Sequence, residues 1–289
     1  MSSTSMGTRT GAATSPIIVA NNLHKIFPAP RGVKKAQPIV AVDDVSFELH
    51  PDECLAIVGE SGSGKTTVAR MLVGLETLTG GELTVNGESR VRGVRHLSDR
   101  RRWAREVQYV FQDPYSSLNG RQRIIDTIAS SVALHADGAG RSAGSAKKTA
   151  QDILQSVGLG PQFWQKFPHQ LSGGQRQRVA IARALAANPS VIVLDEAVAA
   201  LDVSIQAQIL NLLGDIKRQR KVSYLFISHD LAVVNQISDR MIVMENGQVV
   251  DAGVTAEILA NPVQPYTRAL RAAVPRAGWK PVRRERLAS

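Results

Sequence analysis

The stretch "CLAIVGESGSGKTTVARMLVG", residues 54–74, decides the fold of this chain. It opens with a short apolar run that ends on a glycine, which predicts a buried strand. Glycine, serine and lysine follow, and "KTTVARMLVG" (65–74) has the pattern of a helix closed by a glycine. A glycine-rich turn between a buried strand and a helix is the setting of a phosphate-binding loop.

Residues 59–66, called the P-loop below, match the pattern G-x-x-x-x-G-K-[ST]. Glycines let backbone N–H groups curl around phosphates, and the helix N-terminus adds positive potential. We expect Lys65 to reach the β- and γ-phosphates and the Thr66 hydroxyl to ligate Mg²⁺. The strand and helix on either side disfavour a chance glycine turn. The predicted phosphate-binding residues are Gly59, Ser61, Gly62, Ser63, Gly64, Lys65, Thr66 and Thr67.

Two carboxylates end the apolar run "VIVLDE" (191–196). Ligands bind at the carboxyl ends of strands in open α/β sheets, so a solvated strand end is the weaker interpretation. Asp195 can hold Mg²⁺ directly or through water, and Glu196 can act as general base toward a water. His229 ends "FISH" and Gln112 follows "VQYVF" in the same way. Taken alone, each of these two has a structural role as its simpler interpretation.

Apolar strands alternating with helical patterns predict a mainly parallel α/β sheet. Residues 113–187 are expected to be helical with one interruption, at 136–146. A helix over 204–221 would bury one face. The predicted strands are 17–27, 42–49, 54–59, 107–111, 191–196 and 223–229, with hairpins turning at Asn86-Gly87 and Asn246-Gly247. The predicted face of the 204–221 helix carries Ile205, Ile209, Leu212, Leu213 and Ile216.

Composition narrows the class of protein. The chain has 289 residues, 43% of them hydrophobic, enough for one large domain or two small ones. Its net charge of +10 suggests an anionic partner, whether nucleic acid, a lipid surface or nucleotide phosphates. The single cysteine, Cys54, excludes an internal disulfide and a metal site built from this chain's thiolates alone. We expect Cys54 to be buried at the start of its strand.

No apolar run approaches the roughly 18–20 residues that span a bilayer, and the polar N-terminus lacks the core of a secretory signal. The expected location is therefore cytoplasmic, with at most peripheral contact with a membrane. Residues 1–16 are expected to be a disordered tail.

A second glycine-rich segment, "LSGGQ" (171–175, the LSGGQ segment), lies 107 positions after Lys65, from 172 − 65. Taken alone, a serine before glycines is an ordinary helix N-cap, with a helix expected from Gln175. The set of motifs points elsewhere. The P-loop, Gln112, the LSGGQ segment, "LDE", "ALD" (200–202) and His229 occur in that order. Over about residues 17–275 the sequence resembles the ATP-binding subunit of an ABC transporter.

The resemblance implies a P-loop NTPase (RecA-like) core of residues 17–112 and 188–255, with an antiparallel β subdomain. Residues 113–187 would form an inserted helical subdomain within an ATPase domain of 17–255. Residues 256–289 would be a C-terminal extension of the peptide-permease type, with a basic tail.

The resemblance also implies roles and ligands, with ATP and Mg²⁺ bound. Gln112 would touch Mg²⁺ and the attacking water and sense the membrane partner, His229 would contact the γ-phosphate, and Phe27 would stack on adenine. The LSGGQ segment would complete the ATP site of a second subunit. Residues implied to act on that partner's ATP are Ser172, Gly173, Gly174, Gln175 and Asp202.

Two stretches, "FQDPYSSLN" (111–119) and "NPVQPYTRALRAAVP" (261–275), resemble the peptide/nickel import branch. Many members have His where Gln264 stands, Glu where Gln170 stands and Ser where Ala199 stands. These departures leave ATP chemistry intact and bear only on the solute. The loop at 28–38 and the stretch "AVDDVSF" (41–47) look most like those of the second of the two ATPases in a dipeptide or oligopeptide permease. Import of nickel chelates or another small solute stays open.

The branch implies that this chain lies peripherally at the cytoplasmic face of the inner membrane and has several partners. They are a second ATPase subunit, with a paralogue favoured over an identical copy, two transmembrane permease subunits and an extracytoplasmic solute-binding protein.

Three other classes remain as alternatives. ABC-type ATPases of DNA repair carry long coiled coils or other large inserts, whereas only 60 positions separate Gln112 from Ser172 (172 − 112), without sustained heptads. No nucleic-acid partner is therefore expected. A binding-only subunit would not need Glu196 and His229. A small-molecule kinase would not need the LSGGQ segment.

Overall fold

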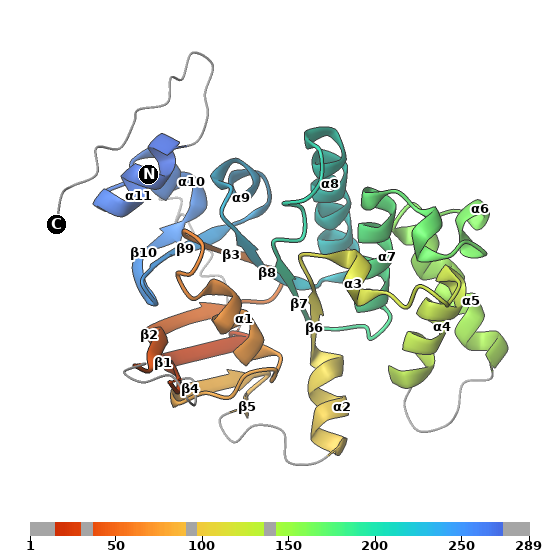
Figure 1. The fold of residues 1–289 in the computed structure, drawn as a ribbon, viewed down its shortest axis with the longest axis horizontal. Helices are drawn as coiled ribbons and strands as arrows, with labels where there is room; N and C mark the ends of the chain where they lie inside the picture. Colours follow the sequence, from red (N-terminus) through yellow and green to blue (C-terminus); the bar gives the residue numbers. More distant parts are fainter. Residues whose placement is uncertain (1–14, 30–36, 91–96, 136–142, 274–289) are drawn as a thin grey trace, which may run out of the picture.

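The computed structural model describes residues 15–29, 37–90, 97–135 and 143–273. Most of the predicted N-terminal tail lies outside these residues, as do parts of the predicted loops at 28–38 and 136–146. The C-terminal basic tail also lies outside them. The described residues form two sheets, which pack against helices (Figure 1).

The larger sheet has six strands in the order β10-β9-β3-β8-β7-β6. Strands β9, β3, β8, β7 and β6 are parallel, and β10 is antiparallel to β9. The bounds are β3 (Cys54–Val58), β6 (Val107–Val110), β7 (Val191–Asp195), β8 (Ser223–Ser228), β9 (Arg240–Glu245) and β10 (Gln248–Val254). The predicted mainly parallel sheet is confirmed, and the residues following β6, β7, β8 and β3 meet at its carboxyl edge.

The smaller sheet is antiparallel, in the order β2-β1-β4-β5. It comprises β1 (Ile18–Phe27), β2 (Ile39–Leu49), β4 (Gly80–Val85) and β5 (Glu88–Ser89). Both predicted hairpins are confirmed. Their turns have positive φ at both central residues, 49° and 76° at Asn86 and Gly87, and 49° and 84° at Asn246 and Gly247. Such angles characterise the type I′ turn that Asn-Gly favours.

Strand β3 lies between two hydrophobic clusters because its side chains alternate. Leu55 and Ile57 belong to the cluster shared with helix α1 (Lys65–Leu72) and the small sheet. Cys54, Ala56 and Val58 belong to the cluster shared with helices α7 (Gly173–Leu185), α8 (Val203–Arg220) and α9 (Leu231–Ile237). The predicted burial of Cys54 is confirmed, and this burial raises the pKa of its thiol far above the usual range.

Figure 1 shows α4 to α7 gathered at one side of the molecule, away from the small sheet. Within the described ranges, none of the helices combines the length and apolarity that crossing a bilayer requires. The helices are α1 (Lys65–Leu72), α2 (Leu97–Glu106), α3 (Pro114–Ser117), α4 (Ile124–His135), α5 (Ala143–Ser156), α6 (Pro161–Trp164), α7 (Gly173–Leu185), α8 (Val203–Arg220), α9 (Leu231–Ile237), α10 (Thr255–Ala260) and α11 (Pro265–Ala273).

The predicted helix over 204–221 is confirmed as α8. Ile209, Leu213 and Ile216 are buried in the core, and Ile205 and Leu212 pack against it while partly exposed.

The expectation of one interruption in the helical stretch 113–187 was wrong. Residues 118–123, 157–160 and 165–172 also leave the α-helix, with one 3-10 turn at Pro168–Gln170. Gly158 adopts a φ of 77° after α5, and Pro161 starts α6. The helix expected from Gln175 begins two residues earlier, because Ser172 caps α7 at Gly173.

Candidate functional site

The P-loop joins the fully buried strand β3 to α1, and its backbone depends on glycine. Gly59, Gly62 and Gly64 have φ of 154°, 85° and 100°, angles that L side chains rarely adopt. At two of them space is also lacking. A Cβ on Gly59 would lie 2.2 Å from the carbonyl oxygen of Met244, and one on Gly64 would lie 2.3 Å from that of Ala41. Strand β9 and strand β2 thus pack closely against the loop at these two glycines.

Lys65 turns its ammonium group back into the P-loop. Its Nζ donates to the carbonyl oxygens of Gly59 (2.9 Å) and Glu60 (2.7 Å), and to the hydroxyl of Ser63 (3.3 Å). The side chain is buried, and this burial lowers the pKa of the ammonium group, an effect opposed by the carboxylate of Glu196. A small cavity of about 160 Å³ lies in front of the loop. It is lined by Ala41, Ser61, Gly62, Gly64, Lys65, Thr66, Thr67 and Glu196.

Asp195, the last residue of β7, faces the start of α1. The Thr66 hydroxyl donates to Asp195 Oδ1 at 3.3 Å, and the Tyr109 hydroxyl donates to Oδ2 at 2.5 Å. Burial raises the pKa of the Asp195 carboxyl group, although these two hydrogen bonds oppose the shift. Burial likewise raises the pKa of Tyr109 far above its usual range.

Our sequence prediction missed Tyr109. The signal was present in the alternation of β6 and β7, because Val107 and Tyr109 share a face with Val191 and Val193. Asp195 lies two residues after Val193, so its side chain is expected on the same face of the sheet as Tyr109.

Residues that follow β6, β7 and β8 meet around Glu196. The amide of Gln112 donates to Glu196 Oε2 at 2.9 Å, and His229 Nδ1 lies 3.1 Å from Oε1. Both carboxylate oxygens of Glu196 are therefore engaged by groups from neighbouring strand ends. Glu196 has a φ of 47°, a left-handed conformation that costs a non-glycine residue about 1–3 kcal/mol and occurs often at functional sites.

The carboxyl edge of the sheet thus gathers a lysine, a threonine hydroxyl, two carboxylates, an amide and an imidazole beside the P-loop. Predicted site residues brought together here are Lys65, Thr66, Gln112, Asp195, Glu196 and His229. Phe27 lies apart at the end of β1, half-buried, with its ring centroid 4.9 Å from the Lys25 ammonium. It does not line the cavity in front of the P-loop.

The LSGGQ segment forms the start of α7. Ser172 Oγ accepts from the backbone N–H of Gln175 at 3.3 Å, and Gln175 Oε1 accepts from the N–H of Ser172 at 3.0 Å. This reciprocal pair is a capping box. Ser172, Gly174 and Gln175 line a cavity of about 270 Å³ that shares no lining residue with the one at the P-loop.

Asp202 also caps a helix, accepting at 3.0 Å from the N–H of Ile205 in α8. This backbone hydrogen bond lowers the pKa of its carboxyl group. The residues predicted to act on a partner's ATP therefore lie outside the P-loop cavity of this chain.

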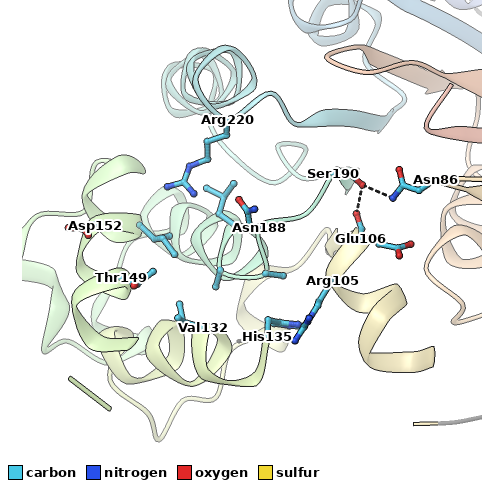
Figure 2. Close-up of a pocket in the computed structure, with 14 residues that line it drawn as sticks. Asn86, Arg105, Glu106, Val132, His135, Thr149, Asp152, Asn188, Ser190 and Arg220 are labelled. Atoms are coloured by element: carbon cyan, nitrogen blue, oxygen red, sulfur yellow. Dashed lines mark hydrogen bonds between the residues drawn. The ribbon is translucent and has the colours of Figure 1, made fainter. Parts of the chain in front are cut away.

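A cavity of about 610 Å³ opens at the amino-terminal edge of the larger sheet (Figure 2). Its lining mixes cationic with acidic side chains and with the carbonyl ends of α4 and α7, so its charge favours neither an anion nor a cation. The titratable lining residues are Arg105, Glu106, His135, Asp152 and Arg220. None of the predicted site residues lines this cavity.

The sequence matches one protein family and a group of curated relatives. Residues 42–199 match the family described as ABC transporter. The chain is 47% identical over 264 residues to the glutathione import ATP-binding protein GsiA of Escherichia coli (strain K12), and 46% identical over 262 residues to that of Salmonella paratyphi A. Each match covers 90% of this chain and 41% of the relative. The chain therefore spans about two fifths of the length of the curated relatives it matches.

The fold also resembles solved structures. The dimeric post-hydrolysis structure of the ATP-binding cassette MJ0796, bound to ADP and Pi, superposes with a TM-score of 0.73 at 27% identity. The match covers 82% of this chain and 98% of that one. CbiO1 of Clostridium perfringens, at 23% identity and the same TM-score, shares the fold. The predicted P-loop ABC ATPase fold is thereby confirmed, and the chain belongs to the ABC transporter family.

Proposed function

We propose that this chain hydrolyses ATP to power peptide import through an ABC transporter. The observation that carries the proposal is the meeting of Gln112, Glu196 and His229 at three strand ends beside the P-loop. The similarity to glutathione import proteins supports a peptide as solute, since glutathione is itself a short peptide. Nickel chelates or another small solute are the alternative that a transport assay must separate.

In this proposal the P-loop binds the phosphates of ATP. Backbone N–H groups of the loop and the N-terminus of α1 face the phosphates, and Lys65 reaches the β- and γ-phosphates. The phosphate-binding residues are the predicted set: Gly59, Ser61, Gly62, Ser63, Gly64, Lys65, Thr66 and Thr67. Phe27 supplies a face on which the adenine stacks, at the end of β1.

Thr66 and Asp195 fit a magnesium site because they offer a hydroxyl and a carboxylate oxygen 3.3 Å apart, which are the hard donors that this ion prefers. Tyr109 fixes the second oxygen of Asp195 and so orients the carboxylate. Gln112 would complete the set of ligands. Mg²⁺ bound there would neutralise charge on the phosphates.

Glu196 acts as the general base in this proposal. It takes the proton of a water that attacks the γ-phosphorus, while the bond from that phosphorus to the bridging oxygen breaks and leaves ADP and phosphate. Gln112 and His229 hold the two oxygens of Glu196, so the carboxylate cannot rotate freely. His229 is 58% exposed in its side chain and therefore remains accessible to the γ-phosphate.

The LSGGQ segment supplies half of a second ATP site. Within this chain it lines a different cavity from that of the P-loop, and α7 offers a helix N-terminus with two glycines. Ser172, Gly173, Gly174 and Gln175 therefore face the nucleotide held by a partner's P-loop, with Asp202 at the same interface.

The partner is a second ATPase subunit, a paralogue rather than an identical copy. Two transmembrane permease subunits and an extracytoplasmic solute-binding protein complete the assembly, in which this chain lies at the cytoplasmic face of the inner membrane. Nucleic acid is not a partner. The ATPase domain comprises residues 17–255, with the helical subdomain at 113–187, preceded by the tail 1–16. Residues 256–289 form the extension.

Two experiments in the native host test this proposal. Affinity purification of the tagged chain from membranes should recover a second ATPase and membrane-spanning subunits. A membrane-free complex would contradict the transport function.

Uptake of labelled peptides and of a nickel chelate should then be compared with and without the chain. Loss of peptide uptake alone supports the peptide assignment, and loss of nickel uptake alone would replace it. The Lys65→Ala chain serves as the inactive control.

A further inference from the structure

The C-terminal helix α11 touches the P-loop. The hydroxyl of Tyr266 accepts a hydrogen bond from the backbone N–H of Glu60 at 3.0 Å, across 206 positions of sequence. Tyr266 belongs to the stretch "QPYTRAL", which lies outside the strands and helices of the nucleotide core. A side chain from the extension is thereby placed on the loop proposed to bind phosphate.

Helix α11 is held firmly enough to position this hydroxyl. Thr267 is completely buried, and its hydroxyl donates to Asp251 of β10 at 2.9 Å. Arg271 donates to the carbonyl oxygen of Ala260, at the end of α10, at 2.9 Å. The side chains of Tyr266 and Leu270 are partly buried and pack against the larger hydrophobic cluster. The contact at the P-loop therefore comes from a docked helix.

One peptide unit connects Tyr266 to Lys65. The Glu60 N–H donates to the Tyr266 hydroxyl, and the Gly59 carbonyl oxygen accepts from the Lys65 ammonium at 2.9 Å. Both groups belong to the same planar Gly59–Glu60 peptide. In a trans peptide these two groups point in opposite directions. Rotating this peptide would break both hydrogen bonds together.

The Gly59–Glu60 peptide needs such a restraint because it follows glycine. Gly59 has a φ of 154° and no side chain to restrict its rotation. Farther along the loop, the carbonyl oxygen of Ser63 accepts from the N–H of Gly247 at 3.1 Å, so the β9–β10 hairpin holds the loop at that point. Tyr266 holds the first turn.

We propose that Tyr266 is a positioning residue for ATP binding, acting through the Gly59–Glu60 peptide on the P-loop and Lys65. The inference rests on the proposed role of the P-loop in ATP binding. A restrained loop meets the phosphates without first losing conformational freedom, so the restraint strengthens binding. It leaves the general base and the step of hydrolysis unchanged.

The test is the affinity of the full chain for MgATP, measured by calorimetry, with Tyr266→Phe as the variant. Phenylalanine keeps the packing and removes the hydroxyl. Loss of one hydrogen bond that orders the loop predicts a dissociation constant about three- to tenfold higher. In the assembled transporter, turnover at saturating ATP should stay within about twofold, since only binding changes.

Tyr224→Phe is the matched control. It also removes one tyrosine hydroxyl, which donates to the carbonyl oxygen of Leu213 at 3.0 Å in the core. This variant should lose thermal stability and keep its affinity for MgATP. Thr267→Val, which removes the anchor of α11 to Asp251, should weaken MgATP binding through the displaced Tyr266.

Hydrogen exchange at the Glu60 amide supplies a readout specific to the contact. The Tyr266→Phe chain should exchange this amide faster, with the amides of β3 unchanged. Equal MgATP affinities for Tyr266→Phe and the unaltered chain would overturn the inference about Tyr266 and leave the proposed function standing. Failure of the unaltered chain to bind MgATP would overturn the proposed function as well.

Discussion

The P-loop and the LSGGQ segment share a composition of serine and glycine before a helix, yet their backbones differ. In the P-loop, Gly59, Gly62 and Gly64 take positive φ, and the chain closes around the ammonium group of Lys65. In the LSGGQ segment, Gly173 and Gly174 are the first residues of α7 itself. The first loop can surround a ligand, whereas the second can only present a helix end to one.

The two regions also use glycine for different reasons. At Gly64 both the φ and the neighbouring Ala41 carbonyl exclude a side chain. At Gly174 a Cβ would lie 2.4 Å from Ile205 of α8, so packing within the chain requires glycine. At Gly173 a Cβ would make an ordinary 3.5 Å contact with Leu201. Among the described residues, no neighbour requires glycine at position 173, which is consistent with a requirement imposed by a second subunit.

The largest expected effect separates binding from hydrolysis on the P-loop side. Glu196→Gln should bind ATP normally, because the amide is close in size and the P-loop is untouched. Turnover in the assembled transporter should fall by roughly 10²–10⁴-fold, the scale of a lost general base. Single-turnover hydrolysis measures this directly. Near-normal turnover would remove Glu196 from that role.

A pair of glycine substitutions compares the two regions directly. Gly64→Ala should lower the free energy of unfolding by about 1–3 kcal/mol, since alanine must adopt a strained φ beside the Ala41 carbonyl. Its ATP affinity should fall as well. Gly173→Ala should change stability by less than about 1 kcal/mol, because alanine suits a helix. Its own ATP affinity should stay unchanged.

Chemical denaturation and ATP titration of the isolated chains measure both effects. In the assembled pair, Gly173→Ala should lower hydrolysis about tenfold or more, by displacing the end of α7 from the nucleotide. Equal behaviour of the two variants would show that the loops do not differ as described.

Much of this site could be predicted from sequence because its parts follow strands. The buried run "VIVLDE" predicts both a strand and two carboxylates at its carboxyl end, so the positions of Asp195 and Glu196 could be predicted. Lys65 and Thr66 followed from the pattern of the P-loop. Tyr109 was missed although the alternation of β6 and β7 carried the signal.

Other features left no readable pattern. The contact of Tyr266 with Glu60 joins segments 206 positions apart, and its existence depends on how α11 docks. The left-handed φ of Glu196 arises from tertiary constraint, since glutamate has no local preference for it. The breaks in the helical stretch follow local signals, at Gly158, Pro161 and Ser172, that its helical pattern obscured.

A smaller effect concerns the buried carboxylate on the P-loop side. Because burial raises the pKa of Asp195 above its ordinary value of 3.8, the charged form destabilises the folded chain. This cost is fully present above the raised pKa and disappears as the pH falls through it toward the unfolded value. Asp195→Asn should therefore raise the midpoint of thermal unfolding at pH 7 without nucleotide, because the amide carries no buried charge.

Differential scanning calorimetry at pH 7 and at acidic pH measures this gain, which should shrink on acidification. The sign should reverse when MgATP is added, because the variant binds it less well. A variant less stable than the unaltered chain without nucleotide at pH 7 would contradict the account.

The central claim is that the LSGGQ segment serves the ATP of another subunit. It is tested most directly by photoaffinity labelling with an azido-ATP, combined with an assay of hydrolysis, in a pair that contains Ser172→Trp. The account predicts that this chain keeps its own label while hydrolysis at the partner's P-loop is lost. Loss of label from this chain, with hydrolysis at the partner's site retained, would contradict it.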